Sequence, residues 1–233
     1  MASPLIIGHR GASAVAPENT MAAFREAIAA GADGIEFDVR LSRDGVPVII
    51  HDNNLRRTSR LPHRIADLTW SELDELNVAV PSLEQLFKLF EENDLSLYLE
   101  MKSDSPSERE PLAKACCKLI DEYSFKDRVF VECFDLPALE VIKRVDPKIK
   151  TAALFEPRLL SNQLIIDRAM AIGASALALH HRLARNSLVQ KAKDAGLAVA
   201  VWTVDEPAWI ERARATGLDA LITNNPAAML SHR

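Results

Sequence analysis

The sequence predicts an α/β protein with a single parallel barrel of eight strands enclosed by helices, the TIM-type (β/α)8 fold, over residues 1–233. Short apolar runs bounded by turn residues alternate with amphipathic stretches along the chain, which is typical of βαβ units and a parallel sheet. The chain has 233 residues, and eight such units need roughly 200 to 250. No stretch rich in Gly, Pro or Ser divides it, so we expect one domain.

Eight apolar runs are the predicted barrel strands. They are residues 5–8, 34–40, 95–101, 129–133, 151–155, 176–180, 198–204 and 220–223. Parallel strands need a dozen or more residues between them for a helical crossover, and every interval in this series is long enough. The series therefore predicts a closed parallel sheet.

A ninth apolar run, residues 46–50, does not fit that series. Only residues 41–45 separate it from the strand at 34–40, and they contain the Asp44-Gly45 pair that favours a hairpin. We therefore expect a hairpin excursion from the second strand. Residues 53–81 then form a short insertion before the helix expected at 82–93.

The helices have recognisable end signals. Asn19 is the expected N-cap of a helix over residues 21–28, and Gly31 is expected to end that helix. Gly173, Gly196 and Gly217 precede later strands in the same way. The chain thus repeats a helix followed by a strand.

The composition is that of a soluble globular protein, with 48% hydrophobic and 26% charged residues. The net charge of −5 predicts no general attraction to nucleic acid and no stable membrane association. The three cysteines lack zinc-ligand spacing and are expected to be reduced. With no secretion signal or membrane span in the sequence, we expect a cytoplasmic location. The oligomeric state stays open.

Polar residues stand where a barrel would ordinarily place apolar ones. They are His9, Glu36, Asp38, His51, Glu100 and Lys102. Residues i and i+2 of a strand face the same side, so the pairs 36/38 and 100/102 are each expected to point together. The alternative for Glu36 and Asp38 is a strand face exposed to solvent, and the alternative for Glu100 and Lys102 is a purely structural salt bridge. Apolar residues at 35, 37 and 39 favour a covered outer face, which directs the polar set toward the barrel mouth.

Three carboxylates converging on one mouth would repel one another unless a positive charge lies between them. Oxygen ligands favour a hard divalent cation, so Glu36, Asp38 and Glu100 predict one Mg²⁺ or Ca²⁺ ion. Splitting a phosphodiester also needs a base and an acid, roles that suit His9 and His51. Arg10 and Lys102 would add positive charge against phosphate oxygens.

The motifs that contain these residues form an ordered series. They are His9-Arg10-Gly11, Pro17-Glu18-Asn19-Thr20, Glu36-Phe37-Asp38-Val39, Asp44-Gly45, His51-Asp52, Pro81-Ser82-Leu83-Glu84, Leu99-Glu100-Met101-Lys102, Phe134-Asp135, Val201-Trp202-Thr203-Val204 and Leu221-Ile222-Thr223. In order and spacing this series resembles the glycerophosphodiester phosphodiesterases, a family of TIM barrels similar to those of PI-PLC. The resemblance extends over nearly the whole chain.

The resemblance implies hydrolysis of a small-molecule glycerophosphodiester, such as a deacylated phospholipid headgroup, to sn-glycerol 3-phosphate and an alcohol. It implies one divalent ion on Glu36, Asp38 and Glu100, and acid–base catalysis by the two histidines. It also implies phosphate contacts by Arg10 and Lys102, and pocket positions for Phe134 and Trp202. In the mechanism that it implies, a glycerol hydroxyl attacks phosphorus, and water then opens the cyclic phosphate.

The chain departs from the family pattern at two places. Thr223-Asn224-Asn225-Pro226 stands where the family often has Thr-Asp-x-Pro, so a carboxylate is missing beside the last strand. Glu132-Cys133 stands where small polar or amide residues are common. Both departures concern the surroundings of the site and the substrate range.

Two other functions remain open from the sequence. A phospholipase D-like or lysophospholipid phosphodiesterase would need a lipid-contacting surface, and the apolar residues of the insertion are the one candidate: Leu55, Leu61, Ile65, Leu68 and Trp70. A non-catalytic phosphate- or metal-binding barrel is the other alternative. It would have no need for two acid–base histidines.

Overall fold

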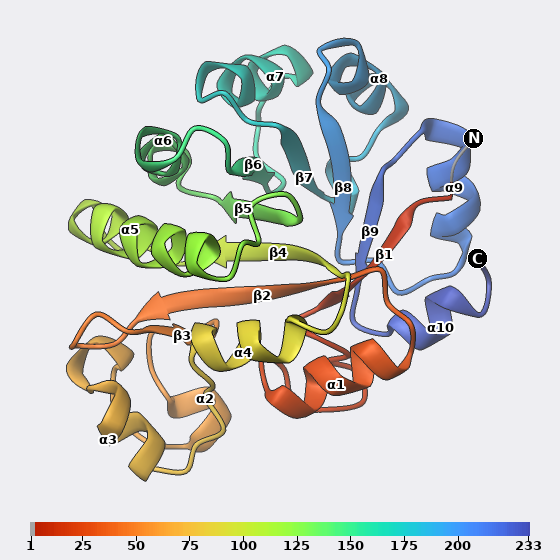
Figure 1. Ribbon diagram of the computed structural model, residues 1–233. Helices are drawn as coiled ribbons and strands as arrows, with labels where there is room; N and C mark the ends of the chain where they lie inside the picture. The colour runs from red at the N-terminus through yellow and green to blue at the C-terminus, as the bar shows by residue number, and fades with distance from the viewer. Residues whose placement is uncertain (1–2) are drawn as a thin grey trace.

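The computed structural model describes residues 3–233, which form a closed barrel of eight parallel strands (Figure 1). The strands are β1 (Leu5–His9), β2 (Gly34–Leu41), β4 (Ser96–Met101), β5 (Val129–Cys133), β6 (Lys150–Phe155), β7 (Ala176–His180), β8 (Ala198–Trp202) and β9 (Ala220–Thr223). Their order around the barrel is β1-β9-β8-β7-β6-β5-β4-β2, and the β1–β2 pairing closes it. The predicted fold is confirmed.

The strand β3 (Pro47–Ile49) is the predicted hairpin excursion. It runs antiparallel to β2, and Val39 pairs with Ile49. The β1–β2 pairing stops at Glu36, so β3 occupies the part of β2 that extends beyond β1. The hairpin brings His51, two residues after β3, back to the carboxyl end of the barrel strands.

Helices surround the barrel (Figure 1). They are α1 (Met21–Ala29), α4 (Leu83–Phe90), α5 (Pro106–Glu122), α6 (Leu136–Val145), α7 (Asn162–Ala171), α8 (Asn186–Asp194), α9 (Ala208–Thr216) and α10 (Pro226–Leu230), with a 3-10 turn η2 (His181–Leu183) after β7. The predicted stop at Gly217 is confirmed, because this residue ends α9 with a φ of 75°.

The predicted N-cap of α1 is wrong by one residue. The Thr20 hydroxyl, not the Asn19 side chain, accepts the Ala23 N–H at 3.2 Å. Asn19 instead has a left-handed φ of 57°, and its side chain points into the barrel, where it contacts Asp38. A threonine caps a helix nearly as well as an asparagine, so the cap was available at either position.

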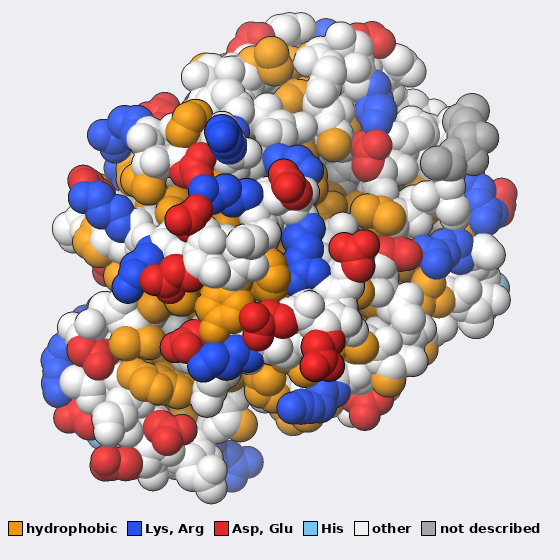
Figure 2. Space-filling view, viewed as in Figure 1, with side chains coloured by type: hydrophobic (Ala, Val, Ile, Leu, Met, Phe, Trp, Pro, Cys, Tyr) orange, Lys and Arg blue, Asp and Glu red, His pale blue; other side chains and the backbone are white. Residues whose placement is uncertain are grey.

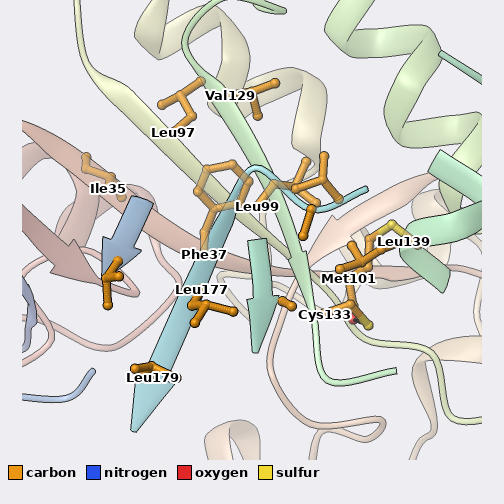
Figure 3. Close-up of a cluster of buried hydrophobic side chains, with 14 of the residues drawn as sticks. Ile35, Phe37, Leu97, Leu99, Met101, Val129, Cys133, Leu139, Leu177 and Leu179 are labelled. Carbon is orange, nitrogen blue, oxygen red and sulfur yellow. Dashed lines mark hydrogen bonds between the residues drawn. The ribbon is translucent and has the colours of Figure 1, made fainter. Parts of the chain in front are cut away.

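Apolar side chains fill two layers. The larger lies between the strands and the helices, and it includes Ile35 and Phe37 (Figure 3). Val39 belongs to the same layer, and all three side chains are completely buried. The smaller fills the barrel interior with residues such as Ile7 and Ala200. The alternate residues of β2 therefore face inward, as predicted from the apolar positions between them.

The insertion has a small core of its own. It comprises α2 (Arg56–Ser59), a 3-10 turn η1 (Ile65–Asp67) and α3 (Trp70–Glu75), which lie together at one side of the barrel in Figure 1. Leu55 and Ile65 are completely or almost completely buried there, and Leu61, Leu68 and Trp70 pack around them. Of the five residues that were the candidate lipid-contact surface, two are therefore buried, and the other three are partly exposed.

The outer surface mixes charges of both signs. Acidic and basic side chains alternate over the face shown in Figure 2, without one large patch of either sign. Cys116, Cys117 and Cys133 are buried free thiols. Within residues 3–233, no helix is both long enough and apolar enough to cross a membrane.

Candidate active site

A cavity of about 240 Å³ opens at the carboxyl ends of the barrel strands. Its lining residues are His9, Arg10, Glu36, His51, Glu100, Lys102, Glu132, Phe134, Leu154, Glu156, Trp202 and Ile222. Of the nine predicted site residues, eight line this cavity. The ninth, Asp38, is completely buried and lies against two of the lining cations.

Three carboxylates meet in the cavity. One oxygen each from Glu36, Glu100 and Glu132 lies within 4.8 Å of the other two. All three side chains are at least nine-tenths buried, and the Glu132 Oε2 atom has no hydrogen-bond partner. Burial, with the nearby Asp38 charge, raises the pKa of Glu36 and of Glu100 to about 8, and burial raises that of Glu132 well above its usual range. Such a cluster is suited to a divalent cation.

Asp38 has different surroundings from the other carboxylates. Asn19 Nδ2 donates a 2.6 Å hydrogen bond to Asp38 Oδ2, and Lys102 Nζ lies 3.0 Å from Oδ1. Arg10 Nε lies 3.1 Å from Oδ2. Burial alone would raise the pKa of Asp38, but Lys102 and Arg10 hold it well below its usual range. Asp38 is therefore an ionised counter-charge for both cations.

The backbone after β1 positions Arg10. This residue has a left-handed φ of 54°, and its N–H donates a 2.9 Å hydrogen bond to Glu36 Oε2. A Cβ on the next residue, Gly11, would lie 2.6 Å from the Ala23 carbonyl carbon, so the turn is packed directly on α1. The Arg10 guanidinium also donates to Glu18 at 2.8 Å.

His9 is oriented by the departure at Asn224. The Nδ1 atom of His9 lies 2.7 Å from Asn224 Oδ1, and Asn224 Nδ2 donates to Asp205 Oδ2 at 2.8 Å. Because Asp205 can only accept, it orients the amide with its oxygen toward His9, so Nδ1 carries the proton. The Nε2 atom is then the free acceptor, 3.9 Å from Glu36. Burial and the Arg10 charge lower the pKa of His9, which favours the neutral ring.

His51 has a carboxylate partner. Its Nδ1 atom lies 2.7 Å from Asp52 Oδ1, and Arg57 donates to Asp52 Oδ2 at 2.7 Å. Arg57 also donates to Glu18 at 2.6 Å, which links the insertion to the turn after β1. Burial lowers the pKa of His51, while the Asp38 and Asp52 charges oppose that shift. Burial thus lowers the pKa of both histidines.

Two aromatic side chains form a wall of the cavity. Phe134 and Trp202 pack edge to face with their ring centres 5.5 Å apart, and Trp202 Nε1 donates to the Ala178 carbonyl at 3.1 Å. Lys102 Nζ lies 5.9 Å from the Phe134 ring centre. Both predicted aromatic residues therefore border the same space as the charged groups.

The structure gives site roles to several residues for which the sequence predicted none. Glu132 joins the carboxylate cluster, and its register partner on β4 is Glu100. Asn224 and Asp205 orient His9 from outside the cavity, and Asn19 holds Asp38. The alternation of a strand identifies Glu132 as inward-facing, whereas Asp205 lies in a loop with no such signal.

Comparison with known proteins places these residues in context. Residues 9–228 match the sequence model of the glycerophosphoryl diester phosphodiesterase family. The chain is 33% identical to a glycerophosphodiester phosphodiesterase of Caldanaerobacter subterraneus, over 97% of this chain and 96% of that protein. It is also similar to an Oleispira antarctica phosphodiesterase solved with its product sn-glycerol-3-phosphate (26% identity, TM-score 0.89, 99% and 96% covered). A Thermotoga maritima glycerophosphodiester phosphodiesterase is similar too (27% identity, TM-score 0.83, 100% of both chains).

Proposed function

The chain belongs to the glycerophosphoryl diester phosphodiesterase family, and we propose that it hydrolyses glycerophosphodiesters to sn-glycerol 3-phosphate and an alcohol in the cavity described above. The observation that carries this proposal is the convergence of two histidines, a buried carboxylate cluster and two cations on one 240 Å³ space. That space suits a small-molecule diester, and a similar structure holds sn-glycerol-3-phosphate.

His9 is the proposed base of the first step. Its Nε2 lone pair accepts the proton of the substrate's glycerol hydroxyl while that oxygen forms a bond to phosphorus. His51, which is paired with Asp52, acts in its protonated form and donates a proton to the departing alkoxide as the bond of that oxygen to phosphorus breaks. In the second step the roles reverse. His51 takes a proton from water, and His9 returns its proton to the ring oxygen of the cyclic phosphate.

One divalent cation, Mg²⁺ or Ca²⁺, is the proposed cofactor, and the predicted ligand set was Glu36, Asp38 and Glu100. The buried carboxylate oxygens fit a hard cation, because oxygen atoms are the ligands it prefers. When bound, such an ion withdraws charge from phosphate oxygens. Glu36 and Glu100 meet in the cavity, and Lys102 Nζ contacts both Glu100 Oε1 and Asp38 Oδ1 from one side.

Arg10 and Lys102 are the proposed phosphate-binding cations. Both line the cavity, and both are fixed by Asp38 on the opposite side. Donors that are held in place before the substrate arrives need not reorganise as charge develops on phosphorus. Phe134 and Trp202 are proposed to contact the apolar parts of the substrate. The cytoplasmic location stays a prediction, which cell fractionation tests.

The test is release of glycerol 3-phosphate from a panel of glycerophosphodiesters by metal-stripped protein, before and after Mg²⁺ or Ca²⁺ is restored. We expect metal-dependent release by the wild type and its loss in His9→Ala and Glu100→Ala. His63→Ala, an exposed histidine of the insertion, is the matched control and should retain activity. Failure of the wild type to cleave any diester with either ion would refute the proposal.

The cyclic intermediate has a separate test. The substrate is a diester made chiral at phosphorus by isotope or sulfur labels, hydrolysed in H₂¹⁸O. Reaction through a cyclic phosphate replaces the departing alcohol with a solvent oxygen in two displacements, so the configuration at phosphorus is retained. A single inverting displacement would contradict the two-step mechanism and leave the overall reaction intact. Cleavage of lysophospholipids in preference to deacylated diesters would instead favour the lipid-directed alternative.

A further inference from the structure

Glu132 is the one carboxylate of the cavity cluster that the family pattern does not account for. It lies on β5, where small polar or amide residues are common in the family motif. Its side chain is only 1% exposed. A buried carboxylate without partners is costly, so its presence needs a physical reason.

The register of the sheet aims Glu132 at the other carboxylates. Glu100 on β4 pairs with Glu132 on β5, so the two side chains lie beside each other on the inner face of the barrel. On the far side, Glu132 pairs with Ala152 of β6, and its side chain is among those that line the cavity. The Glu132 carboxylate therefore faces the cavity and not the packed interior.

The hydrogen bonding of Glu132 points to a missing ligand. Its Oε2 atom is buried and has no hydrogen-bond partner, whereas Glu100 Oε1 contacts Lys102 and Glu36 Oε2 accepts the Arg10 N–H. One oxygen of Glu132 lies within 4.8 Å of an oxygen of both Glu36 and Glu100. Glu132 thus has the free electron pairs and the position that a metal ligand requires.

We infer that Glu132 is a direct ligand of the divalent cation, adding a carboxylate from β5 to those of Glu36 and Glu100. The inference rests on the proposed function for the presence of the ion. It assigns to this chain a ligand on β5 in addition to those on β2 and β4. All three ligands are rigid strand residues, which fixes the position of the ion relative to His9.

The experiment measures metal binding directly. Metal-stripped full-length protein is titrated with Mg²⁺ alone and with Ca²⁺ alone by calorimetry, for the wild type, Glu132→Gln, Glu36→Gln and Glu156→Gln. Glu156 is the matched control, because it lines the same cavity from the loop after β6 but pairs with Arg158. We expect Glu132→Gln to weaken binding by at least about tenfold, since even supporting residues of metal sites contribute that much.

The outcomes distinguish the metal site itself from the role of Glu132 as a ligand. Weaker binding by Glu132→Gln, with Glu156→Gln near the wild type, supports the inference. Wild-type affinity in Glu132→Gln, combined with loss in Glu36→Gln, overturns the inference and leaves the proposed metal site standing. Absence of metal binding by the wild type overturns the metal site and the inference together.

A second substitution at the same position tests whether a loss of affinity comes from the missing carboxylate or from misfolding. Glu132→Ser removes the carboxylate without placing an amide among the remaining acids, and we expect it to lose affinity by the same factor. Circular dichroism and thermal melts in chelator verify that both variants fold. The rise in melting temperature on adding the ion is an independent readout, and it should shrink in both variants. An unchanged rise in a folded variant contradicts the inference.

Discussion

Replacing Glu36 with glutamine is expected to stabilise the metal-free protein near neutral pH, although the residue lies at the centre of the site. Burial raises the pKa of Glu36 from 4.5 to about 8, so the folded protein keeps this carboxyl protonated where the unfolded chain ionises it. For a raised pKa, the stability contributed by the group is fully present below about pH 4.5 and is lost as the pH rises to about 8. Glutamine does not titrate and avoids that loss.

The size of the effect follows from the shift. Each pH unit in this window costs the wild type about 1.4 kcal/mol of unfolding free energy. Between about pH 5.5 and pH 7.5, the difference between variant and wild type should therefore grow by about 2 to 3 kcal/mol in favour of the variant. A glutamine oxygen can still accept the Arg10 N–H, so the local hydrogen bond is retained.

Urea denaturation in chelator at the two pH values measures this difference, because titrating groups outside the carboxylate cluster are common to both proteins and cancel. Glu26→Gln, an exposed glutamate of α1, is the control and should show no such growth. With saturating divalent cation the order should reverse, since the variant loses a ligand. A difference that changes by less than about 0.5 kcal/mol between the two pH values, well below the expected change, would refute the account of the buried cluster.

Two further predictions concern the histidine and the cation. Asn224→Asp places a carboxylate on His9 Nδ1 and should raise the pKa of that ring. The acidic limb of the pH profile of kcat/KM then moves to higher pH. The control is Asn225→Asp, which changes the neighbouring helix cap and should leave this limb in place. If the limb does not move in Asn224→Asp, His9 is excluded as the base. Lys102→Met strips Asp38 of a buried partner and should lower the free energy of unfolding by roughly 3 kcal/mol in urea titrations. A loss below about 1 kcal/mol, the size of an exposed pair, would show that this ion pair is effectively solvated.

The barrel and most of its cavity were predictable because strand periodicity is local. The alternation around Phe37 placed its acidic neighbours inside the barrel, and the Asp44-Gly45 turn explained why His51 returns to the same end. These signals need only the order of residues within one strand or one turn. They hold whatever the distant parts of the chain do.

The remaining features depend on contacts between distant segments. Asp38 looked equivalent to Glu36, but cations from two other loops neutralise it, and only the folded chain brings them together. Position 224 has no carboxylate, but the Asn224 amide donates a hydrogen bond to the Asp205 carboxylate and so connects it to His9. The inserted apolar residues suggested a lipid surface because their sequence does not reveal that they bury one another.

The separately packed insertion has a consequence for how this scaffold can diversify. A lobe whose apolar residues pack on one another and on the β3 hairpin can be lengthened, shortened or exchanged on its far side without repacking the barrel wall. It is joined to the site residues by His51 and Asp52, which directly precede it, and by the hydrogen bonds of Arg57 to Asp52 and Glu18. A replacement lobe that keeps these anchoring residues is therefore free to vary elsewhere, and new substrate preferences can arise there while the phosphorus chemistry stays unchanged.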